Sequence, residues 1–373
     1  MTLSLRRSKI AAIVAVARGL SNDEPGNATL QQRHRATFDA EELAIVLSHY
    51  ELGIIESITE FARGSRQSPK VGIVTEGGKY LLKRRPAERA RLDRVRFAHR
   101  VQDHLIQAGF PLARLIRTRL HQATLLQLRD QIYELFEFRP GHAFAQKPEE
   151  ARDAGVVLAR FHEATGSFDP PASLTKPRGD YHDAAAVRTG MAAIGSALSM
   201  HDSFTGDELE LTQLVEFLLS AYNRAADSVN RQDLSSIAEQ VIHSDWHPGN
   251  LLFRENRVFA VVDYDSMRYA RRIIDVANGA LQFSMIAKGD PASWPDELDL
   301  ERYAAFLAGY ESISGLSPSE RECLVPLMIE ALIAECVSPI AATGSVGRWA
   351  GYRVLQMVRR KIGWLNAEAT RLG

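Results

Sequence analysis

The chain has 373 residues, of which 45% are hydrophobic and 24% are charged. These are the proportions of a folded globular chain, and they exclude wholesale disorder, a collagen-like repeat and a bundle of membrane helices. Because 45 basic residues are balanced by 46 acidic ones, the net charge of −1 predicts neither a nucleic-acid partner nor a membrane partner. The length favours two lobes, and the composition indicates no particular oligomeric state.

The two cysteines, Cys323 and Cys336, exclude a disulfide framework and a zinc site of the CxxC type. Three basic residues precede the apolar run Ile10–Ala17 and imitate the start of a secretory signal, but the run is far shorter than the roughly 20 residues of a membrane helix. We therefore expect residues 1–37 to form an N-terminal extension and the protein to be cytoplasmic.

Residues 38–138 have the pattern of a small antiparallel sheet crossed by one helix. The acidic first turn at Asp39–Glu42 begins a short helix that we expect to end near His49. Turn residues then separate five apolar runs, and a helical pattern between Pro86 and Gln107 interrupts them. The strands are predicted at residues 54–58, 71–74, 80–83, 123–128 and 131–138.

Residues 139–373 form the second predicted lobe, which begins where Arg139-Pro140-Gly141 interrupts the last strand. Most of this lobe is helical, so the predicted fold class is α+β with two lobes. An apolar, turn, apolar passage at residues 241–266 is the exception, and such exceptions often mark functional sites. The helices before it are predicted at residues 148–163, 181–197, 207–228 and 234–240, and long helices follow it.

The passage 241–266 contains a pattern of polar residues between apolar strands. His243-x-Asp245 is followed by Asn250, and Asp263 ends the next strand, which resembles the catalytic and metal-binding loops of kinase-fold phosphotransferases. In such an arrangement Asp245 accepts the proton of a substrate hydroxyl. The hairpin brings Asn250 and Asp263 together as hard oxygen ligands for Mg²⁺ on the phosphates of a nucleotide.

Together with other motifs, this pattern resembles the aminoglycoside phosphotransferase and choline kinase superfamily. Tyr80–Lys83 matches its strand lysine, Leu158–His162 matches its helical Leu-Ala-x-Leu-His, and Asp275 matches the aspartate that braces the loop. The runs Phe97–Pro111 and Tyr133–Gly141 resemble the spore-coat-kinase and homoserine-kinase-like branch. The resemblance implies a protein-kinase-like fold and transfer of the γ-phosphoryl group from ATP, with Mg²⁺, to a hydroxyl of an aminoglycoside, choline, homoserine or sugar-like acceptor.

The resemblance also implies roles for further residues. Lys83 contacts the nucleotide phosphates, Gly64 and Ser65 belong to the turn that covers them, and backbone groups of the hinge at Phe136–Phe138 read adenine. His243, Asp265 and Asp275 are expected to support the catalytic and metal-binding residues, and the C-terminal helices to form the acceptor pocket.

One position departs from the family pattern. The family often pairs the strand lysine with a glutamate of the crossing helix, but Asp103 is the only acidic residue between positions 98 and 103, and Glu88 and Asp93 lie earlier. One of these three residues replaces the glutamate, the ion pair is absent, or Lys83 is positioned in another way.

Two other functions stay open at this stage. His243, Asp245 and His247 alternate along the chain and would suit zinc or manganese in a metallohydrolase. A pseudokinase would bind a nucleotide and regulate a partner without turnover. A cationic acceptor would need acidic pocket residues and a carboxylate acceptor would need arginine; the candidates are Glu330, Glu335, Arg268 and Arg271.

Overall fold

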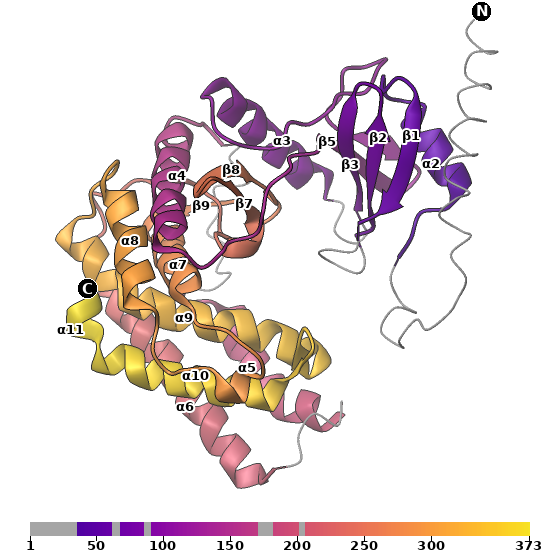
Figure 1. Cartoon of the computed structure of the whole chain (residues 1–373). Coiled ribbons are helices and arrows are strands. Elements are labelled where there is room, and N and C mark those ends of the chain that lie inside the picture. The colour runs from indigo at the N-terminus through magenta and orange to yellow at the C-terminus, as the bar shows by residue number, and fades with distance from the viewer. Residues whose placement is uncertain (1–35, 62–67, 86–90, 171–181, 201–205) are drawn as a thin grey trace, which may run out of the picture. The chain divides into compact units, whose positions relative to one another are not determined.

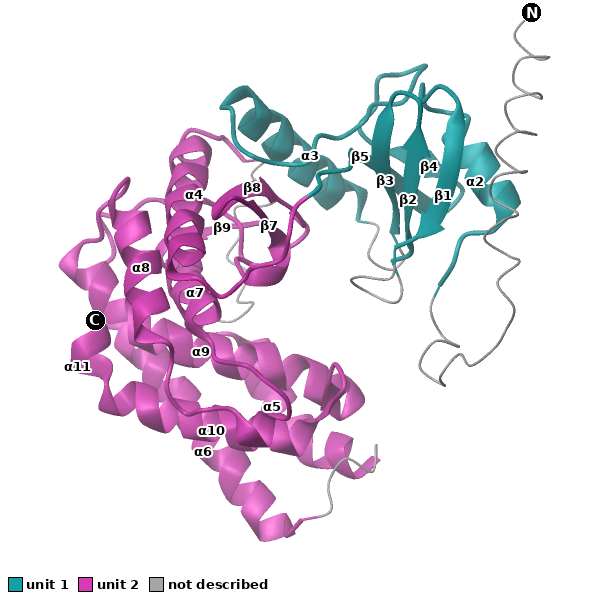
Figure 2. Ribbon diagram, viewed as in Figure 1, with its two compact units in different colours: residues 1–140 teal, residues 141–373 magenta. Residues whose placement is uncertain are grey.

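The computed structural model describes residues 36–61, 68–85, 91–170, 182–200 and 206–373. Gly64, Ser65 and all but the end of the predicted extension 1–37 therefore lie outside the described residues. The chain divides into two compact units, residues 1–140 and residues 141–373 (Figure 2). A small antiparallel sheet in unit 1 and a mainly helical unit 2 confirm the predicted α+β class.

Unit 1 is built on a sheet whose five strands, among the described residues, run in the order β1-β2-β3-β5-β4. All neighbours are antiparallel, and the predicted strand at 123–128 is shorter than expected. The elements are α2 (Ala40–Leu47), β1 (Ile55–Glu60), β2 (Lys70–Thr75), β3 (Gly78–Arg85), α3 (Leu92–Gln107), β4 (Leu126–Leu128) and β5 (Gln131–Glu137) (Figure 1).

The two faces of this sheet differ in chemistry. Leu82 and Leu135 belong to the apolar core that also contains Leu43 and Leu47 of α2. Because successive side chains of a strand point to opposite faces, the residues beside these leucines in β3 and β5 belong to the other face. That face carries charged side chains, and Lys83 is one of them.

Unit 2 consists of helices and short hairpins. Its longest helices are α6 and α9. The elements are α4 (Pro148–Gly166), α5 (Ala185–Met200), α6 (Glu208–Asn230), β6 (Glu239–Ile242), β7 (Leu251–Arg254), β8 (Arg257–Val261), β9 (Arg268–Arg271), α7 (Ile273–Ser284), α8 (Leu300–Glu311), α9 (Pro318–Thr343), β10 (Ser345–Val346), β11 (Trp349–Ala350), α10 (Gly351–Ala367) and α11 (Ala369–Leu372), with 3₁₀ turns at Pro248–Asn250 and Pro291–Ser293.

The predicted helix at 234–240 is wrong, because Glu239–Ile242 forms strand β6, which pairs with β9. The Gln240 side chain donates hydrogen bonds to His162 O and Thr165 Oγ1 at the end of α4. These tertiary contacts outweigh the local helical pattern, as is common for short segments.

Helices α4 and α8 pack closely because each presents a glycine to the other. A Cβ atom at Gly155 would lie 2.1 Å from Phe306 O, and one at Gly309 would lie 1.9 Å from Arg152 O. Both contacts are with backbone, so neither a rotamer change nor a small shift would make room for a methyl group. The crossing therefore requires glycine at both positions.

Helix α9 is long and apolar enough to cross a membrane by length and composition alone, among the described residues. However, 72% of its most apolar window is buried inside the protein. It packs against α5, α6 and α7, and a capping box at Ser317 and Glu320 fixes its first turn. These are the properties of a core helix of unit 2.

Candidate active site

The loop between β6 and β7 is held in place by one buried carboxylate, Asp275 of α7. Its two oxygens accept hydrogen bonds from the backbone N–H groups of His243 and Ser244, both at 2.7 Å. His162 of α4 contacts the same carboxylate through Nε2 at 3.1 Å. Burial alone would raise the pKa of Asp275, but His162, His243 and these hydrogen bonds hold it below its ordinary value. Asp275 is therefore an ionised brace for the start of the loop.

His243 lies inside this loop and is fully buried. Its ring packs against the rings of Phe161, Trp246 and Tyr264, with centroid separations of 5.8, 5.3 and 5.3 Å. Burial lowers the pKa of His243, so the ring is neutral. His243 is therefore part of the aromatic packing beneath the loop. The side chain of His247, in contrast, is 36% exposed.

The metal-binding alternative for His243, Asp245 and His247 finds no support in this geometry. Across the part of the chain that the structure describes, no three His, Cys, Asp or Glu side chains converge as a metal-binding group. The alternation that suggested such a site needs an extended strand, but Ser244 has a φ of 65° and turns the chain between the first two residues.

Asp245 follows in the loop and is held from two sides. Asn250 Nδ2 donates to Asp245 Oδ2 and to its backbone oxygen, both at 2.9 Å. His247 Nε2 lies 3.5 Å from Asp245 Oδ1, while its Nδ1 accepts a hydrogen bond from Gly249 N–H. Burial opposes the charge of Asp245, but the contacts with His247 and Asn250 keep its pKa below the ordinary value. The carboxylate is thus oriented, ionised and 39% exposed.

The β7–β8 hairpin brings Asn250 next to Asp263. The backbone oxygen of Asn250 accepts a hydrogen bond from Val262 N–H at 2.9 Å, and Leu251 is paired with Val261. Both side-chain hydrogen bonds of Asn250 described above use its nitrogen, so the amide oxygen is the atom suited to a cation. Asp263 has a φ of 64° and its side chain is exposed, as is that of Asp265. Asn250 and Asp263 together present hard oxygen atoms.

In unit 1, Lys83 lies opposite Glu134 in the β3–β5 ladder and is 9% exposed. The candidate partners proposed from the sequence are engaged elsewhere or not described. Asp103 pairs with Arg117 and Asp93 pairs with Arg91, in each case on the exposed side of α3. Glu88 lies outside the described residues. The family pattern does not single out Glu134, although a charged residue within the apolar run Ile132–Phe136 is a signal for it.

Part of the backbone of the expected hinge at Phe136–Phe138 is engaged within unit 1. The backbone N–H groups of Glu137 and Phe138 donate to the carbonyl oxygens of Arg114 and Lys79, at 2.8 and 2.9 Å. Neither group is therefore available to donate to adenine. The next backbone N–H along the chain belongs to Arg139, because Pro140 has none. Phe136 and Phe138 themselves are half-buried.

Comparisons with known proteins match this architecture. The model of the phosphotransferase enzyme family matches residues 57–323. The chain belongs to this family. A homoserine kinase of Caulobacter vibrioides is 27% identical over 308 residues, covering 82% of this chain and 88% of that protein. The prediction of an enzyme that phosphorylates an alcohol group of a small molecule is confirmed at this level.

Solved structures show that this kinase has the predicted kinase-like fold. The amicoumacin kinase hAmiN, in complex with AMP-PNP and Ca²⁺, has a TM-score of 0.64 and 13% identity, covering 88% of this chain and 94% of that one. An aminoglycoside phosphotransferase from Alicyclobacillus acidocaldarius has a TM-score of 0.61 and 17% identity, covering 94% and 98%. ATP analogues with a divalent cation therefore bind to proteins of this fold.

A hollow of ≈ 450 Å³ in unit 2 adjoins the loop that carries the catalytic candidate Asp245. His247, Pro248 and Gly249 line it on the loop side, and α7, α9 and α10 contribute six of its other lining residues. Its other lining residues include aromatic side chains and two charged ones: Phe144, Trp294, Trp349, Arg302 and Glu335. The lining of this hollow is therefore mostly apolar with a few polar groups, which is typical of small-molecule sites.

The charged candidates named from the sequence have different positions in unit 2. Glu335 lines the hollow beside the loop, whereas Glu330 is fully buried and binds His182 and the backbone of Asp183. Arg268 and Arg271 belong to β9 and do not line this hollow. The arginine in the hollow is Arg302, which is 2% exposed and pairs with Asp299 at 2.9 Å.

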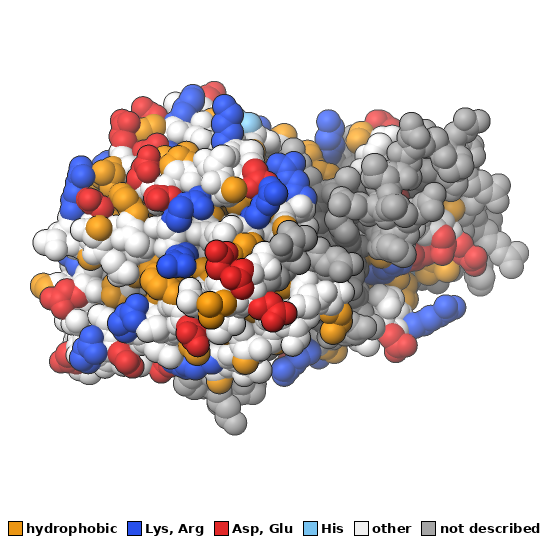
Figure 3. All heavy atoms as spheres, turned by 90° about the horizontal axis from the view of Figure 1, so that it is seen from below, with side chains coloured by type: hydrophobic (Ala, Val, Ile, Leu, Met, Phe, Trp, Pro, Cys, Tyr) orange, Lys and Arg blue, Asp and Glu red, His pale blue; other side chains and the backbone are white. Residues whose placement is uncertain are grey.

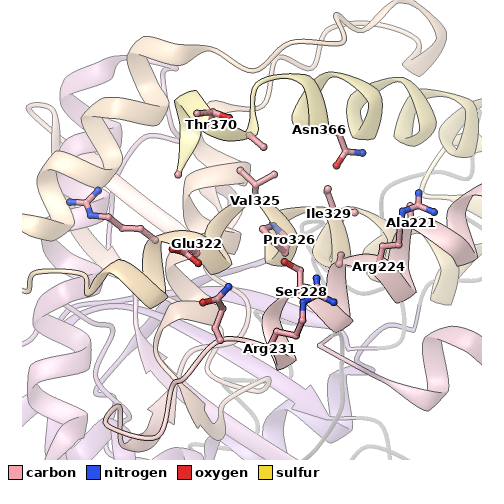
Figure 4. Close-up of a pocket in the computed structure, with 15 residues that line it drawn as sticks. Ala221, Arg224, Ser228, Arg231, Glu322, Val325, Pro326, Ile329, Asn366 and Thr370 are labelled. Atoms are coloured by element: carbon pink, nitrogen blue, oxygen red, sulfur yellow. The ribbon is translucent and has the colours of Figure 1, made fainter.

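A larger hollow of ≈ 650 Å³ lies elsewhere in unit 2, between α6, α9 and the C-terminal helices (Figure 4). Arg224, Arg231 and Glu322 are among its lining residues, but none of the catalytic or metal-binding candidates is. Its size alone therefore does not make it the active site. On the face of the molecule seen in Figure 3, basic and acidic side chains are interspersed, as the nearly neutral sequence predicts.

Proposed function

We propose that the kinase transfers the γ-phosphoryl group of ATP to a hydroxyl group of a small amino alcohol. The observation that carries this proposal is the placement of Asp245. Its carboxylate is ionised, is oriented by Asn250, and belongs to a loop that lines a hollow containing a second carboxylate, Glu335. A hydroxyl acceptor in this hollow would lie next to a base, and its ammonium group would lie next to Glu335.

Asp245 acts as the base in this proposal. It accepts the proton of the acceptor hydroxyl as the oxygen bonds to phosphorus, and the bond between the γ-phosphorus and the bridging oxygen of ADP breaks. The low pKa of Asp245 keeps the carboxylate ready to accept, and the Asn250 amide fixes its direction. Positioning of the two reactants and neutralisation of the charge on the phosphates together contribute most of the rate enhancement in reactions of this kind.

Asn250 and Asp263 are the residues that would hold Mg²⁺. Their fit rests on donor chemistry, because an amide oxygen and a carboxylate are preferred ligands of this ion and the hairpin hydrogen bond at Val262 brings the two residues together. When bound, the ion neutralises negative charge on the phosphates. In unit 1, Lys83 is proposed to contact the nucleotide phosphates and Gly64 and Ser65 to cover them. Because the donor is ATP, we place the kinase in the cytoplasm.

The preference for an amine rests on the charges in the hollow. Glu335 is accessible to solvent there, and its neighbour Gln282 is a neutral donor at 2.6 Å. Although solvent reaches Glu335, the protein atoms around it partly desolvate its carboxylate, and this, together with the charge of Asp245, raises the pKa of Glu335 to about 7. A bound ammonium group would relieve the repulsion between the two carboxylates. Arg302 offers less to a carboxylate acceptor, because Asp299 already neutralises it.

An acceptor screen with radiolabelled ATP tests the proposal. Amino alcohols, homoserine, choline and aminoglycosides are compared with sugars that lack an amine, and labelled product is measured. We expect turnover with an amine-bearing alcohol and a loss of about 10²- to 10⁴-fold in kcat for Asp245→Asn. The control is Glu322→Gln, which neutralises an exposed carboxylate of α9 outside this hollow and should leave kcat unchanged. Calorimetry that detects ATP binding without turnover of any acceptor would instead support the pseudokinase alternative.

A further inference from the structure

The charged face of the unit 1 sheet contains a buried carboxylate that no family motif predicts. Glu134 of β5 is 0% exposed and lies directly opposite Lys83 of β3. Residues paired in this way have Cβ atoms about 4.5–5.5 Å apart and side chains on the same face. The register of β3 and β5 therefore makes the side chains of Lys83 and Glu134 neighbours in every rotamer.

Glu134 is held by two further groups. Arg85 forms a two-pronged ion pair with it, through Nε at 2.7 Å and Nη2 at 2.9 Å. His99 of α3 contacts the same carboxylate through Nε2 at 2.6 Å, and its Nδ1 lies 2.8 Å from Thr124 Oγ1. Burial alone would raise the pKa of Glu134, but His99, Arg85 and Lys83 together hold it well below its ordinary value. Glu134 is therefore a permanent negative charge next to Lys83.

Helix α3 contains no glutamate that could pair with Lys83, and Glu134 supplies a carboxylate next to Lys83 instead. We propose that Glu134 is the carboxylate that positions Lys83 for the nucleotide, and that His99 is the contribution of α3 to this link. The negative charge is the carboxylate of Glu134 in β5, and the His99 ring of α3 orients this carboxylate. The inference rests on the proposed role of Lys83 in binding the nucleotide phosphates.

The opposite face of the same strands provides a matched control. Glu42 of α2 accepts two hydrogen bonds from Arg84 at 2.7 Å and one from Tyr133 at 2.8 Å. Arg84 directly follows Lys83 in β3, and Tyr133 directly precedes Glu134 in β5. Both side chains therefore point to the other face of the sheet. Glu42→Gln thus disturbs a similar ion pair in the same sheet without touching Lys83.

The test is a double-mutant cycle on nucleotide affinity, which needs no acceptor. The full chain and the variants Glu134→Gln, Lys83→Met, Glu42→Gln and Lys83→Met/Glu134→Gln are titrated with Mg²⁺-ATP by calorimetry, and thermal unfolding checks that each is folded. We expect Glu134→Gln to raise Kd roughly tenfold when Lys83 is present and less than about twofold when it is methionine. Glu42→Gln should leave Kd within about twofold of the unmodified chain, and Glu134→Asp should restore part of the affinity.

Three results would overturn the inference. Equal losses from Glu134→Gln with and without Lys83 would show a purely structural role, and so would equal losses in Glu134→Gln and Glu42→Gln. Unchanged affinity in Lys83→Met would remove the phosphate role of Lys83 itself, which is a failure of the proposed function. If Glu134→Gln does not fold, Arg85→Met/Glu134→Gln removes the excess buried charge. Its affinity is then compared with that of Arg85→Met/Glu134→Asp, where we expect the Asp variant to bind more tightly and equal affinity would count against the link.

Discussion

The two units of the kinase fix their functional side chains in different ways. In unit 1, Lys83, Glu134 and His99 come from three separate elements, and side-chain contacts with Arg85 and His99 hold Glu134 beside Lys83. In unit 2, the loop that carries Asp245 is held through its own backbone. Asp275 accepts hydrogen bonds from two loop N–H groups, and Val262 N–H donates to Asn250 O. A loop held by its backbone keeps its geometry when a side chain is shortened, whereas a network of side chains does not.

The largest expected effect comes from removing the brace of unit 2. Asp275→Ala leaves the N–H groups of His243 and Ser244 and the ring of His162 without their buried partner. Loss of one partner of a buried charged contact costs about 3–5 kcal/mol. We expect the free energy of unfolding, measured with urea, to fall by this amount. Glu216→Ala on the exposed side of α6 should change it by less than about 0.5 kcal/mol, and similar values for the two variants would contradict the brace.

The next largest effect should follow from Asp263→Ala. If Asp263 holds a divalent cation, its loss should lower kcat by roughly 10²- to 10³-fold, because a catalytic metal ion contributes several kcal/mol of charge stabilisation. The stability should change little, since the side chain is exposed. Initial rates over a range of Mg²⁺ concentrations, with EDTA as the zero point, measure this. A rate independent of Mg²⁺ in the unmodified chain would exclude the metal site.

A smaller effect is expected from titration of Glu335. Its pKa is raised to about 7, so the carboxylate forms only as the pH rises through that value. The KM for an amine acceptor should therefore fall about tenfold between pH 6 and pH 8, and Glu335→Gln should abolish this dependence. The same raised pKa means that the folded state loses stability as the pH rises from about 4.5 to about 7. A KM that does not vary with pH in the unmodified kinase would contradict the role of Glu335.

The smallest effect should come from Asp103→Ala, because Asp103 is one of the three residues that the sequence offered as a partner of Lys83. Its ion pair with Arg117 is largely exposed, at 36% and 44%, and such pairs contribute about 0.2–1 kcal/mol. We expect the Kd for Mg²⁺-ATP to stay within about twofold of the unmodified value, as measured by calorimetry. A tenfold loss would show that Asp103, and not Glu134, acts on Lys83.

The sequence brought together the loop residues of unit 2 but not the neighbours of Lys83 in unit 1, and the reason is physical. The loop residues Asp245, Asn250 and Asp263 lie within one short passage, where spacing along the chain nearly determines spacing in the fold. Glu134 meets Lys83 only because β3 pairs with β5 in one register, and α3 contributes His99 through tertiary packing. The helix predicted at 234–240 failed for a related reason, because its strand partner β9 lies far along the chain.

The glycine pair at the α4–α8 crossing connects helix packing to the loop that carries Asp245. His162 of α4 contacts both Asp275 and, through Nδ1 at 2.9 Å, the hydroxyl of Tyr310, which lies next to Gly309 on α8. A methyl group at Gly309 would force the two helices apart at this level and so pull on the carboxylate that holds the loop. Gly309→Ala is thus a natural starting point for a temperature-sensitive form of the enzyme, inactivated by mild heat without any change to a residue of the active site.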